Sequence, residues 1–544
     1  MSLWDIIVVG GGIAGSVVSS RLHGLDPTLK ILLIEGGPNT HLVEGIEWTN
    51  MDAAIGGPYD WGFSSVPQAQ LDNRSIISPV GKGLGGGSII NGAAWVRGDQ
   101  ADYNIWGERV NDERWSYNGL LPYMRRSETF YDNTTNSEAH GHGGPIKIQS
   151  VTSTNRVFPL REPLLESWKE IGISALPGFD GNSGQPQGVA ELQENRDQGR
   201  RQLASLAYSL DGIEVLTDAP VASILTRKTT SGKVKAYGVR LANGTEFHGH
   251  ETILSAGAYR TPQILMLSGI GPSDTLQQHN IPVVVDQPAV GKNFHDHVLI
   301  PTVWALTDPE AEGGLTKESG NPVFDQPQYS LGAFIDFYTM TALPKKGLEA
   351  AITENEAAAP GPDHPLLQNR THSAHLLQYS GVAANAVMMT SVVLINEARG
   401  SVTIQSGDIN DSPLIDPNFL GTAVDRYAAR ETIRRNINLL VSKTTMLGRE
   451  YIAGELAADP LTPASSDAEI DARIRQASMG CFHPAGTASM GTVVDTELRV
   501  NGVKGLRVVD SSVIPVSISA NLQVAVYALA EQAAEIIHAT RLEC

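Results

Sequence analysis

The chain has 544 residues, of which 41% are hydrophobic and 18% are charged. This length and composition allow a large buried core and exceed one ordinary domain, so we expect two domains. Acidic residues outnumber basic residues by 59 to 40, and the formal net charge is −19. A surface of this sign repels phosphate backbones and anionic lipid, which argues against nucleic-acid and membrane partners.

The sequence carries few targeting or redox signals. No apolar run approaches the roughly 18 residues that a membrane span requires, and the N-terminus reaches a glycine loop without the order of regions typical of a signal peptide. The two cysteines, Cys481 and Cys544, cannot form a disulfide framework. We expect a soluble, intracellular protein as the chain is given, with a secreted mature form left open by five glycosylation sequons. They begin at Asn73, Asn133, Asn243, Asn369 and Asn410.

The N-terminal stretch "DIIVVGGGIAGSVVSSRL" has the composition of a strand, a glycine loop and a helix in that order. This order is typical of a Rossmann-like dinucleotide site. Gly10 permits the tight turn, Gly12 lets the backbone approach a pyrophosphate, and Gly15 lets the helix pack closely on the strand. The helix predicted to begin near Ile13 would direct its positive end at the phosphates.

A second apolar run, "KILLIEGG", ends in Glu35, twenty residues after Gly15. A carboxylate at this spacing can accept hydrogen bonds from both ribose hydroxyls of an adenosine. The same charge disfavours the 2′-phosphate of NADP, which leaves FAD and NAD as candidate cofactors.

Two further stretches are unusual. Residues 81–98, "GKGLGGGSIINGAAWVRG", hold too much glycine for an ordinary helix or strand. Such a loop suits a place where the main chain lies flat against a ligand and offers its N–H groups. Residues 257–271, "GAYRTPQILMLSGIG", follow the apolar run "ETILSA".

Both stretches resemble the signature segments of the glucose-methanol-choline (GMC) family of flavoprotein oxidoreductases. The likeness extends from residue 5 to about residue 540 and is weakest between residues 310 and 380. The positions that match the first signature are Gly81, Lys82, Leu84, Gly85, Gly86, Ser88, Asn91 and Trp95. Those that match the second are Gly257, Thr261, Pro262, Ser268, Gly269 and Gly271.

The resemblance implies an α/β fold, in which a Rossmann-like FAD-binding domain is joined to an α+β substrate domain with an antiparallel sheet. We expect the FAD-binding domain to comprise residues 1–160, 205–305 and 475–544. The substrate domain then comprises residues 161–204 and 306–474.

The nucleotide motif and the resemblance together predict the residues that bind FAD. They are Gly10, Gly12, Ile13, Ala14, Gly15, Glu35, Gly36, Gly81, Gly83, Gly86, Gly87, Ser88, Asn91, Gly92, Ala93, Val221, Ala256, Asp510, Ser511, Asn521 and Leu522. Family members that bind flavin covalently use a histidine one place before Asn91. Ile90 stands there and cannot form the bond, so the resemblance implies non-covalent FAD.

The C-terminal stretch "CFHPAGTASMG" contains His483, which by itself is most simply explained as a buried ring, with a proton acceptor and a metal ligand as the alternatives. The resemblance, nearest here to aryl-alcohol oxidases and choline-dehydrogenase-like enzymes, implies that His483 is the catalytic base. Asn521 stands where many members have a second histidine and would hydrogen-bond the substrate oxygen. We also expect Asn521 to cap a helix over residues 522–538. That helix would direct its positive end at the flavin.

The implied reaction oxidises an alcohol to a carbonyl compound. The base takes the hydroxyl proton, and the α-hydrogen leaves as hydride to flavin N5. Trp95 and Phe482 are predicted to line the substrate pocket, whose apolar character favours an aromatic or aliphatic primary alcohol. Oxygen or another acceptor then takes the electrons.

Rival functions remain at this point. A hydroxynitrile-type lyase would keep FAD and the histidine without net redox chemistry, and a flavoprotein that only binds ligands is conceivable. A serine hydrolase would need a G-x-S-x-G motif, which is absent from the sequence. Three His-x-His pairs could suggest a metal, but no further ligands accompany them, so no metal site is predicted. They are His140/His142, His248/His250 and His295/His297.

Overall fold

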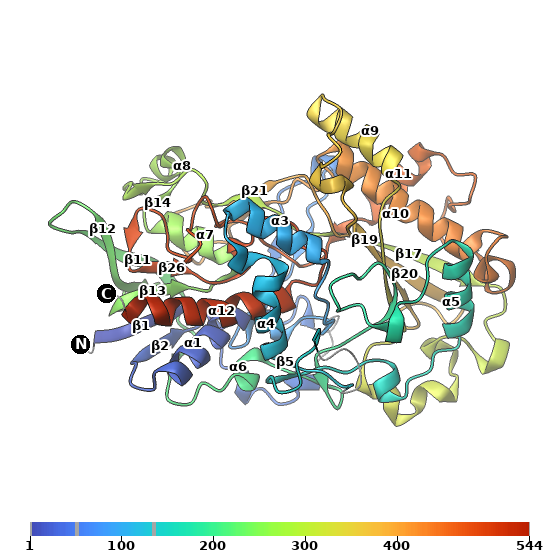
Figure 1. Cartoon of the computed structure of the whole chain (residues 1–544), viewed down its shortest axis with the longest axis horizontal. Coiled ribbons are helices and arrows are strands. Elements are labelled where there is room, and N and C mark those ends of the chain that lie inside the picture. The colour runs from blue at the N-terminus through green and yellow to red at the C-terminus, as the bar shows by residue number, and fades with distance from the viewer. Residues whose placement is uncertain (1–2, 49–53, 133–137, 543–544) are drawn as a thin grey trace.

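The computed structural model describes residues 3–48, 54–132 and 138–542. Two large β-sheets lie toward opposite ends of its long axis (Figure 1). The C-terminal helix α12 (Gln523–Leu542) packs against helices α1 (Ile13–Leu25) and α4 (Tyr117–Ser127). Asn133, one of the five sequons, and Cys544 lie outside the described residues.

The first sheet, called the mixed sheet below, has eight strands within the described residues. Their order is β10-β2-β1-β13-β12-β11, with β26 beside β13 and β25 beside β12. β1 pairs in parallel with β2 on one side and with β13 on the other. Parallel strands that are buried on both faces have continuous hydrophobic sequences. This is the pattern from which the strands were predicted. The strand bounds are β1 Leu3–Val9, β2 Ile31–Ile34, β10 Glu214–Leu216, β11 Val221–Lys228, β12 Val234–Leu241, β13 Glu246–Leu254, β25 Val503–Lys504 and β26 Leu506–Val508.

Glycines make the turn between β1 and α1. Gly10 has a φ of +104°, a conformation that side chains with a Cβ rarely adopt. A Cβ added at Gly15 would lie 1.8 Å from the carbonyl oxygen of Gly10, so only glycine lets helix and strand approach this closely. The predicted strand, glycine turn and helix are therefore confirmed.

The second sheet, called the antiparallel sheet below, has seven strands in the described part of the chain. Its order is β23-β17-β20-β19-β18-β7, with β24 beside β17. Helix α10 (Ala423–Val441) packs on one face of this sheet, and helices α9 (Lys345–Glu356) and α11 (Asp467–Ala477) pack on α10. The strand bounds are β7 Gly188–Glu191, β17 Val298–Leu306, β18 Phe337–Thr341, β19 Ser373–Gln378, β20 Ala386–Val393, β23 Ile452–Glu455 and β24 Met479–Gly480.

Short elements complete the described chain. The remaining α-helices are α3 Gln100–Val110, α5 Arg161–Glu170, α6 Ala204–Ala207, α7 Gly257–Leu267 and α8 Ser273–Gln278. The remaining strands are β3 Phe63–Ser64, β4 Ile77–Ser78, β5 Glu128–Thr129, β6 Ile146–Lys147, β8 Arg196–Asp197, β9 Arg200–Arg201, β14 Ile270–Gly271, β15 Val285–Asp286, β16 Lys292–Phe294, β21 Gly400–Thr403 and β22 Leu414–Asp416.

The combination of a mixed sheet with helices and a separate antiparallel sheet confirms the predicted fold class. Segment 161–204, expected in the substrate domain, contributes β7 to the antiparallel sheet. The predicted boundary at residue 305 falls inside β17, and the one at residue 475 falls inside α11. The domain limits themselves stay a prediction.

Candidate active site

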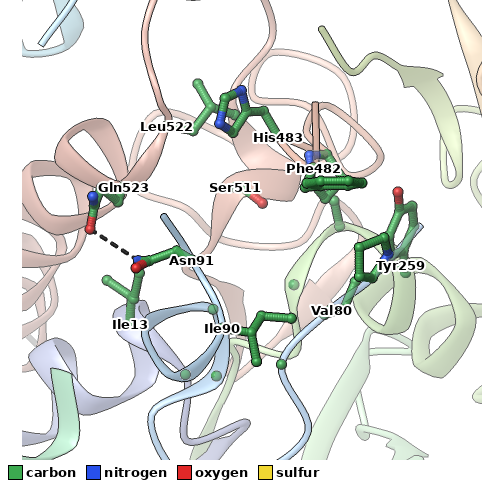
Figure 2. Close-up of a pocket in the computed structure, with 18 of the residues that line it drawn as sticks. Ile13, Val80, Ile90, Asn91, Tyr259, Phe482, His483, Ser511, Leu522 and Gln523 are labelled. Carbon is green, nitrogen blue, oxygen red and sulfur yellow. Dashed lines mark hydrogen bonds between the residues drawn. The ribbon is translucent and has the colours of Figure 1, made fainter. Parts of the chain in front are cut away.

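A cavity of about 800 Å³ lies between the mixed sheet and the antiparallel sheet. Its wall combines the two glycine-rich loops, the start of α7, the loop around His483 and the start of α12. In the view of Figure 2, His483 and Leu522 lie on the side of the cavity opposite Ile90. Residues from both ends of the chain therefore enclose one chamber.

The start of α1 provides an anion site in this wall. Gly12 precedes the helix without a capping side chain, and the first turn carries no acidic residue. Ile13 and Ala14 line the cavity, so the free N–H groups of the first turn are available to a ligand. A helix N-terminus with unsatisfied donors favours phosphate.

The second glycine-rich loop packs directly on the first. A Cβ at Gly86 would lie 2.6 Å from Cα of Gly12, and a Cβ at Gly81 would lie 2.0 Å from the carbonyl oxygen of Gly86. Next in this loop, Asn91 donates from Nδ2 to Oε1 of Gln523 at 3.3 Å, which ties the loop to the start of α12 (Figure 2). The absence of side chains keeps both loops flat against the cavity.

Glu35 follows β2 and its carboxylate is held by backbone donors. Oε2 accepts from the Gly11 N–H and Oε1 from the Gly37 N–H, each at 2.8 Å. Burial raises the pKa of Glu35, and the backbone hydrogen bonds oppose that shift. The backbone N–H groups of Gly36 and Gly83 also act on this carboxylate, so it stands where four main-chain donors converge at the end of β2.

Most of the predicted FAD-binding residues lie in the cavity wall. These are Gly10, Gly12, Ile13, Ala14, Glu35, Gly36, Gly81, Gly86, Gly87, Asn91, Gly92, Ala93, Val221, Ala256, Asp510, Ser511, Asn521 and Leu522. Asp510 also holds the start of α7, because its Oδ2 accepts from the Gly257 N–H at 2.9 Å and from Oγ1 of Thr261 at 2.6 Å.

Three predicted FAD-binding residues do not line the cavity and support the loops instead. Gly15 packs against Gly10, as described above. A Cβ at Gly83 would lie 2.6 Å from Cγ2 of Thr40. Ser88 donates from Oγ to the Gly85 carbonyl at 2.6 Å. The motif pattern does not separate residues that touch a ligand from residues that hold the loop.

Trp95 differs from its prediction as a substrate-pocket residue. It is fully buried and lies outside the cavity wall, although the preceding Ala93 and Ala94 are part of that wall. Its Nε1 donates to Oε2 of Glu128 at 2.8 Å, and its ring packs against Tyr527. Trp95 is therefore a core residue, whereas Phe482, the other predicted pocket residue, does line the cavity.

Asn521 also differs from the prediction that it caps the C-terminal helix. α12 begins at Gln523, two residues later, and the buried Oδ1 of Asn521 has no hydrogen-bond partner among the described residues. Its Nδ2 instead lies 3.2 Å from Nε2 of His483. The Asn521 amide thus lies in the cavity wall and does not hydrogen-bond the free N–H groups at the start of α12.

His483 lies between two hydrogen-bond partners. Its Nδ1 is 2.9 Å from Nδ1 of His297, and its Nε2 is 3.2 Å from Nδ2 of Asn521. An amide nitrogen only donates, so Nε2 of His483 carries the lone pair and its proton sits on Nδ1. His483 therefore donates to His297 and presents an acceptor beside Asn521.

Burial controls the protonation of both histidines. It lowers the pKa of His483 to about 4. The pKa of His297 lies well below its ordinary value, first because of burial and second because of the neighbouring His483. Both rings are neutral at pH 7. His297 stands in the stretch "VGKNFHDH", where no sequence motif connects it with His483.

A buried carboxylate holds the loop that carries His483. Oδ1 of Asp296 accepts from the His483 N–H at 2.8 Å, and burial raises the pKa of Asp296 to about 7. Phe482 has a φ of +65°, which is rare for a residue with a bulky side chain. Such a conformation persists only where the surroundings impose it.

The predicted absence of a metal site is not contradicted. Within residues 3–48, 54–132 and 138–542, no group of three or more His, Cys, Asp or Glu side chains could hold a metal ion. No helix in the same ranges is long and apolar enough to cross a membrane.

Comparisons with known proteins identify the family. Models of the GMC oxidoreductase family match residues 4–299 and 396–530. The GMC-type oxidoreductase acuG of Aspergillus aculeatus is 34% identical over 98% of this chain and 99% of its own. The oxygen-dependent choline dehydrogenase of Burkholderia vietnamiensis is 32% identical over 98% of this chain and 93% of its own.

A solved structure shows the same likeness. A fungal aryl-alcohol oxidase superposes with a TM-score of 0.82 at 26% identity and covers 100% of both chains. The chain belongs to the GMC oxidoreductase family and is a flavoprotein that binds FAD. The residues present fit this cofactor, because the uncapped helix, the flat glycine loops and the Glu35 carboxylate share one cavity.

Proposed function

We propose that the protein oxidises an uncharged alcohol to the corresponding carbonyl compound, with His483 as the base. The observation that carries this proposal is the lone pair on Nε2 of His483, which lies in the cavity wall beside the Asn521 amide. A neutral alcohol is a poor hydride donor until its proton is removed, and a positioned base typically contributes about 10²- to 10⁴-fold.

The chain's residues divide the work as follows. Nε2 of His483 accepts the hydroxyl proton, while Nδ1–H stays donated to His297 and keeps the ring oriented. Asn521 donates from Nδ2 to the substrate oxygen in place of Nε2 and stabilises the negative charge that develops there. Bound FAD supplies the hydride acceptor. The start of α12, with Leu522 and Gln523 in the cavity wall, adds about half a positive charge.

The proposal that the substrate is uncharged follows from the charges around the cavity. Among the described lining residues, the acidic and basic side chains, apart from the neutral His483, are Glu35, Lys82, Arg260 and Asp510. Glu35 and Lys82 stand on the loops expected to bind the nucleotide, Arg260 stands on α7, and Asp510 follows β26. The strands of the antiparallel sheet present Leu299, Leu376 and Val392 instead. A quaternary ammonium group such as that of choline would find no carboxylate in this half.

Anaerobic mixing of the holoenzyme with primary alcohols tests the proposal. Benzyl alcohol and a matched alkanol are expected to bleach the oxidised flavin absorbance, and choline is expected to do so much more slowly. A lyase of the hydroxynitrile type would bind substrate without bleaching. Admitting air afterwards shows whether oxygen or another acceptor takes the electrons.

A further inference from the structure

One face of the antiparallel sheet forms the cavity wall. On β19, Leu376 and Gln378 line the cavity, and on β20 Thr390 and Val392 do so. The residue just before Leu376, His375, points the other way, because its Nδ1 lies 2.7 Å from Oδ1 of Asn436 on α10. Alternation along the strands therefore fixes which side chains meet a substrate.

The row of this face beside the His483 loop is apolar. Val392 pairs with Leu299 of β17, and Leu299 pairs in turn with Met479 of β24, two residues before Cys481. Thr390 lies two residues further along β20 and pairs with Leu376. Because a strand rises about 3.3 Å per residue, Thr390 lies roughly 7 Å beyond Val392.

The next row carries polar side chains beside Leu376. Gln378 donates from Nε2 to Oγ1 of Thr390 at 3.2 Å. Its backbone pairs with Met388, two residues before Thr390 on β20, so the side chain reaches back to the row of Thr390. This bond leaves the amide oxygen of Gln378, its second N–H and the Thr390 hydroxyl for another partner. Tyr338 of β18 lines the same cavity, and burial raises the pKa of its phenol, which therefore stays a donor.

From this arrangement we infer that Gln378 and Thr390, with Tyr338, bind a second uncharged polar group on the substrate. The substrate class is a primary alcohol with a rigid apolar body and a hydroxyl or carbonyl group at its far end. Its far polar group lies roughly 7 Å beyond the apolar row beside the His483 loop, which suits an aryl alcohol with a para hydroxyl group. The inference rests on the proposed function, since it takes His483 to mark the reacting end.

The test compares 4-hydroxybenzyl alcohol with 4-methylbenzyl alcohol, which differ by a hydroxyl in place of a methyl group. With the holoenzyme, the rate constant of flavin reduction divided by the dissociation constant is expected to be about tenfold higher for the hydroxyl compound. In the variant Gln378→Leu/Thr390→Val this preference disappears, while the methyl compound keeps its rate within about threefold. Ser391→Ala, on the same strand but directed at α10, is the matched control and keeps the preference.

Binding without turnover separates the two hypotheses. The dissociation constants of 4-hydroxybenzaldehyde and 4-methylbenzaldehyde are measured from the perturbed flavin spectrum. The polar site is supported if the wild type binds the two aldehydes with different affinities and the double variant does not. This holds even if no alcohol bleaches the flavin. Absence of bleaching would refute the proposed function but not the polar site. Equal binding of both aldehydes by the wild type, or unchanged discrimination in the double variant, overturns the inference.

Discussion

His297 and His483 meet through their Nδ1 atoms at 2.9 Å, and this contact leaves Nε2 of His483 as the nitrogen that faces Asn521. The two residues are 186 positions apart in the sequence. His297 lies next to Asp296, which holds the backbone of His483. One short segment before β17 thus contacts both the backbone and the ring of His483.

Removing the acceptor at His297 is expected to slow flavin reduction. His297→Leu leaves the Nδ1–H of His483 unsatisfied, which costs about 1 to 3 kcal/mol and corresponds to roughly 5- to 150-fold in rate. His297→Asn keeps an acceptor oxygen near the position of Nδ1 and is expected to recover most of that loss. Anaerobic stopped-flow measurements with saturating alcohol compare the two.

The control for this pair is His295→Gln, because His295 bonds the Asn293 carbonyl and does not touch His483. Its reduction rate and its pH profile are expected to match the wild type. Equal losses in the Leu and Asn variants would show that His297 only fills space.

The pH dependence of flavin reduction follows from the low pKa of His483. Because burial lowers this pKa to about 4, the lone pair on Nε2 is present above that value and is lost as the pH falls through it. The reduction rate is therefore expected to stay level from about pH 5 to 8 and to fall about tenfold per unit below pH 4. An inflection at or above pH 6.5 would mean that the ring is exposed to water in the holoenzyme.

Asn521→Ala distinguishes an active-site amide from a helix cap. A lost cap would lower the free energy of unfolding by about 0.5 to 2 kcal/mol. Because Asn521 makes no capping bond, we expect unfolding of the holoenzyme to change by less than about 0.5 kcal/mol. Flavin reduction is expected to slow by roughly 5- to 100-fold through loss of the donor to the substrate oxygen. If Asn521→Ala lowered the free energy of unfolding but left the rate of flavin reduction unchanged, Asn521 would be a helix cap and not an active-site donor.

Two glycines of the first loop are expected to respond differently to alanine. A Cβ at Gly12 has Gly86 Cα at 3.7 Å as its nearest neighbour, so Gly12→Ala is expected to fold normally but to bind FAD at least tenfold more weakly. A Cβ at Gly15 would collide with the Gly10 carbonyl, so Gly15→Ala is expected to destabilise the protein itself. Thermal unfolding of the apoproteins and FAD titration measure both effects. If the Gly12→Ala and Gly15→Ala apoproteins were equally stable, Gly15 would not be the glycine that the packing of α1 on β1 requires.

FAD is expected to dissociate when the protein is denatured. Ile90 lines the cavity and has no group that could bond the flavin covalently. Denaturation followed by filtration should leave the yellow colour in the filtrate, and the mass of the chain should equal that of the polypeptide. A mass increase equal to one FAD would identify a covalent link at another residue.

The sequence predicted that the first glycine loop and Glu35 share one cavity, because this part of the site is local. Gly10, Gly12 and Glu35 lie within one β-turn-helix and the strand that follows it, so their spacing fixes their positions. The pairing of His483 with Asn521 was predicted only through the family resemblance. His297 was missed because no local pattern records a contact across 186 residues.

The errors have equally specific causes. Trp95 follows two residues of the cavity wall, but its ring turns into the core toward Tyr527, and a motif does not record that direction. Asn521 was expected to cap a helix whose first residue proved to be Gln523. Gln378 lies in the stretch where the family resemblance is weakest, so the polar row of the antiparallel sheet appeared only once the strand register was known.

The central claim is that His483 removes the substrate proton, and the rate of anaerobic flavin reduction in His483→Ala tests it most directly. The variant must first be shown to retain FAD, by its absorbance spectrum. If His483 is the base, reduction by a saturating primary alcohol slows by about 10²- to 10⁴-fold relative to the wild type. A loss of less than about tenfold with FAD bound would contradict it.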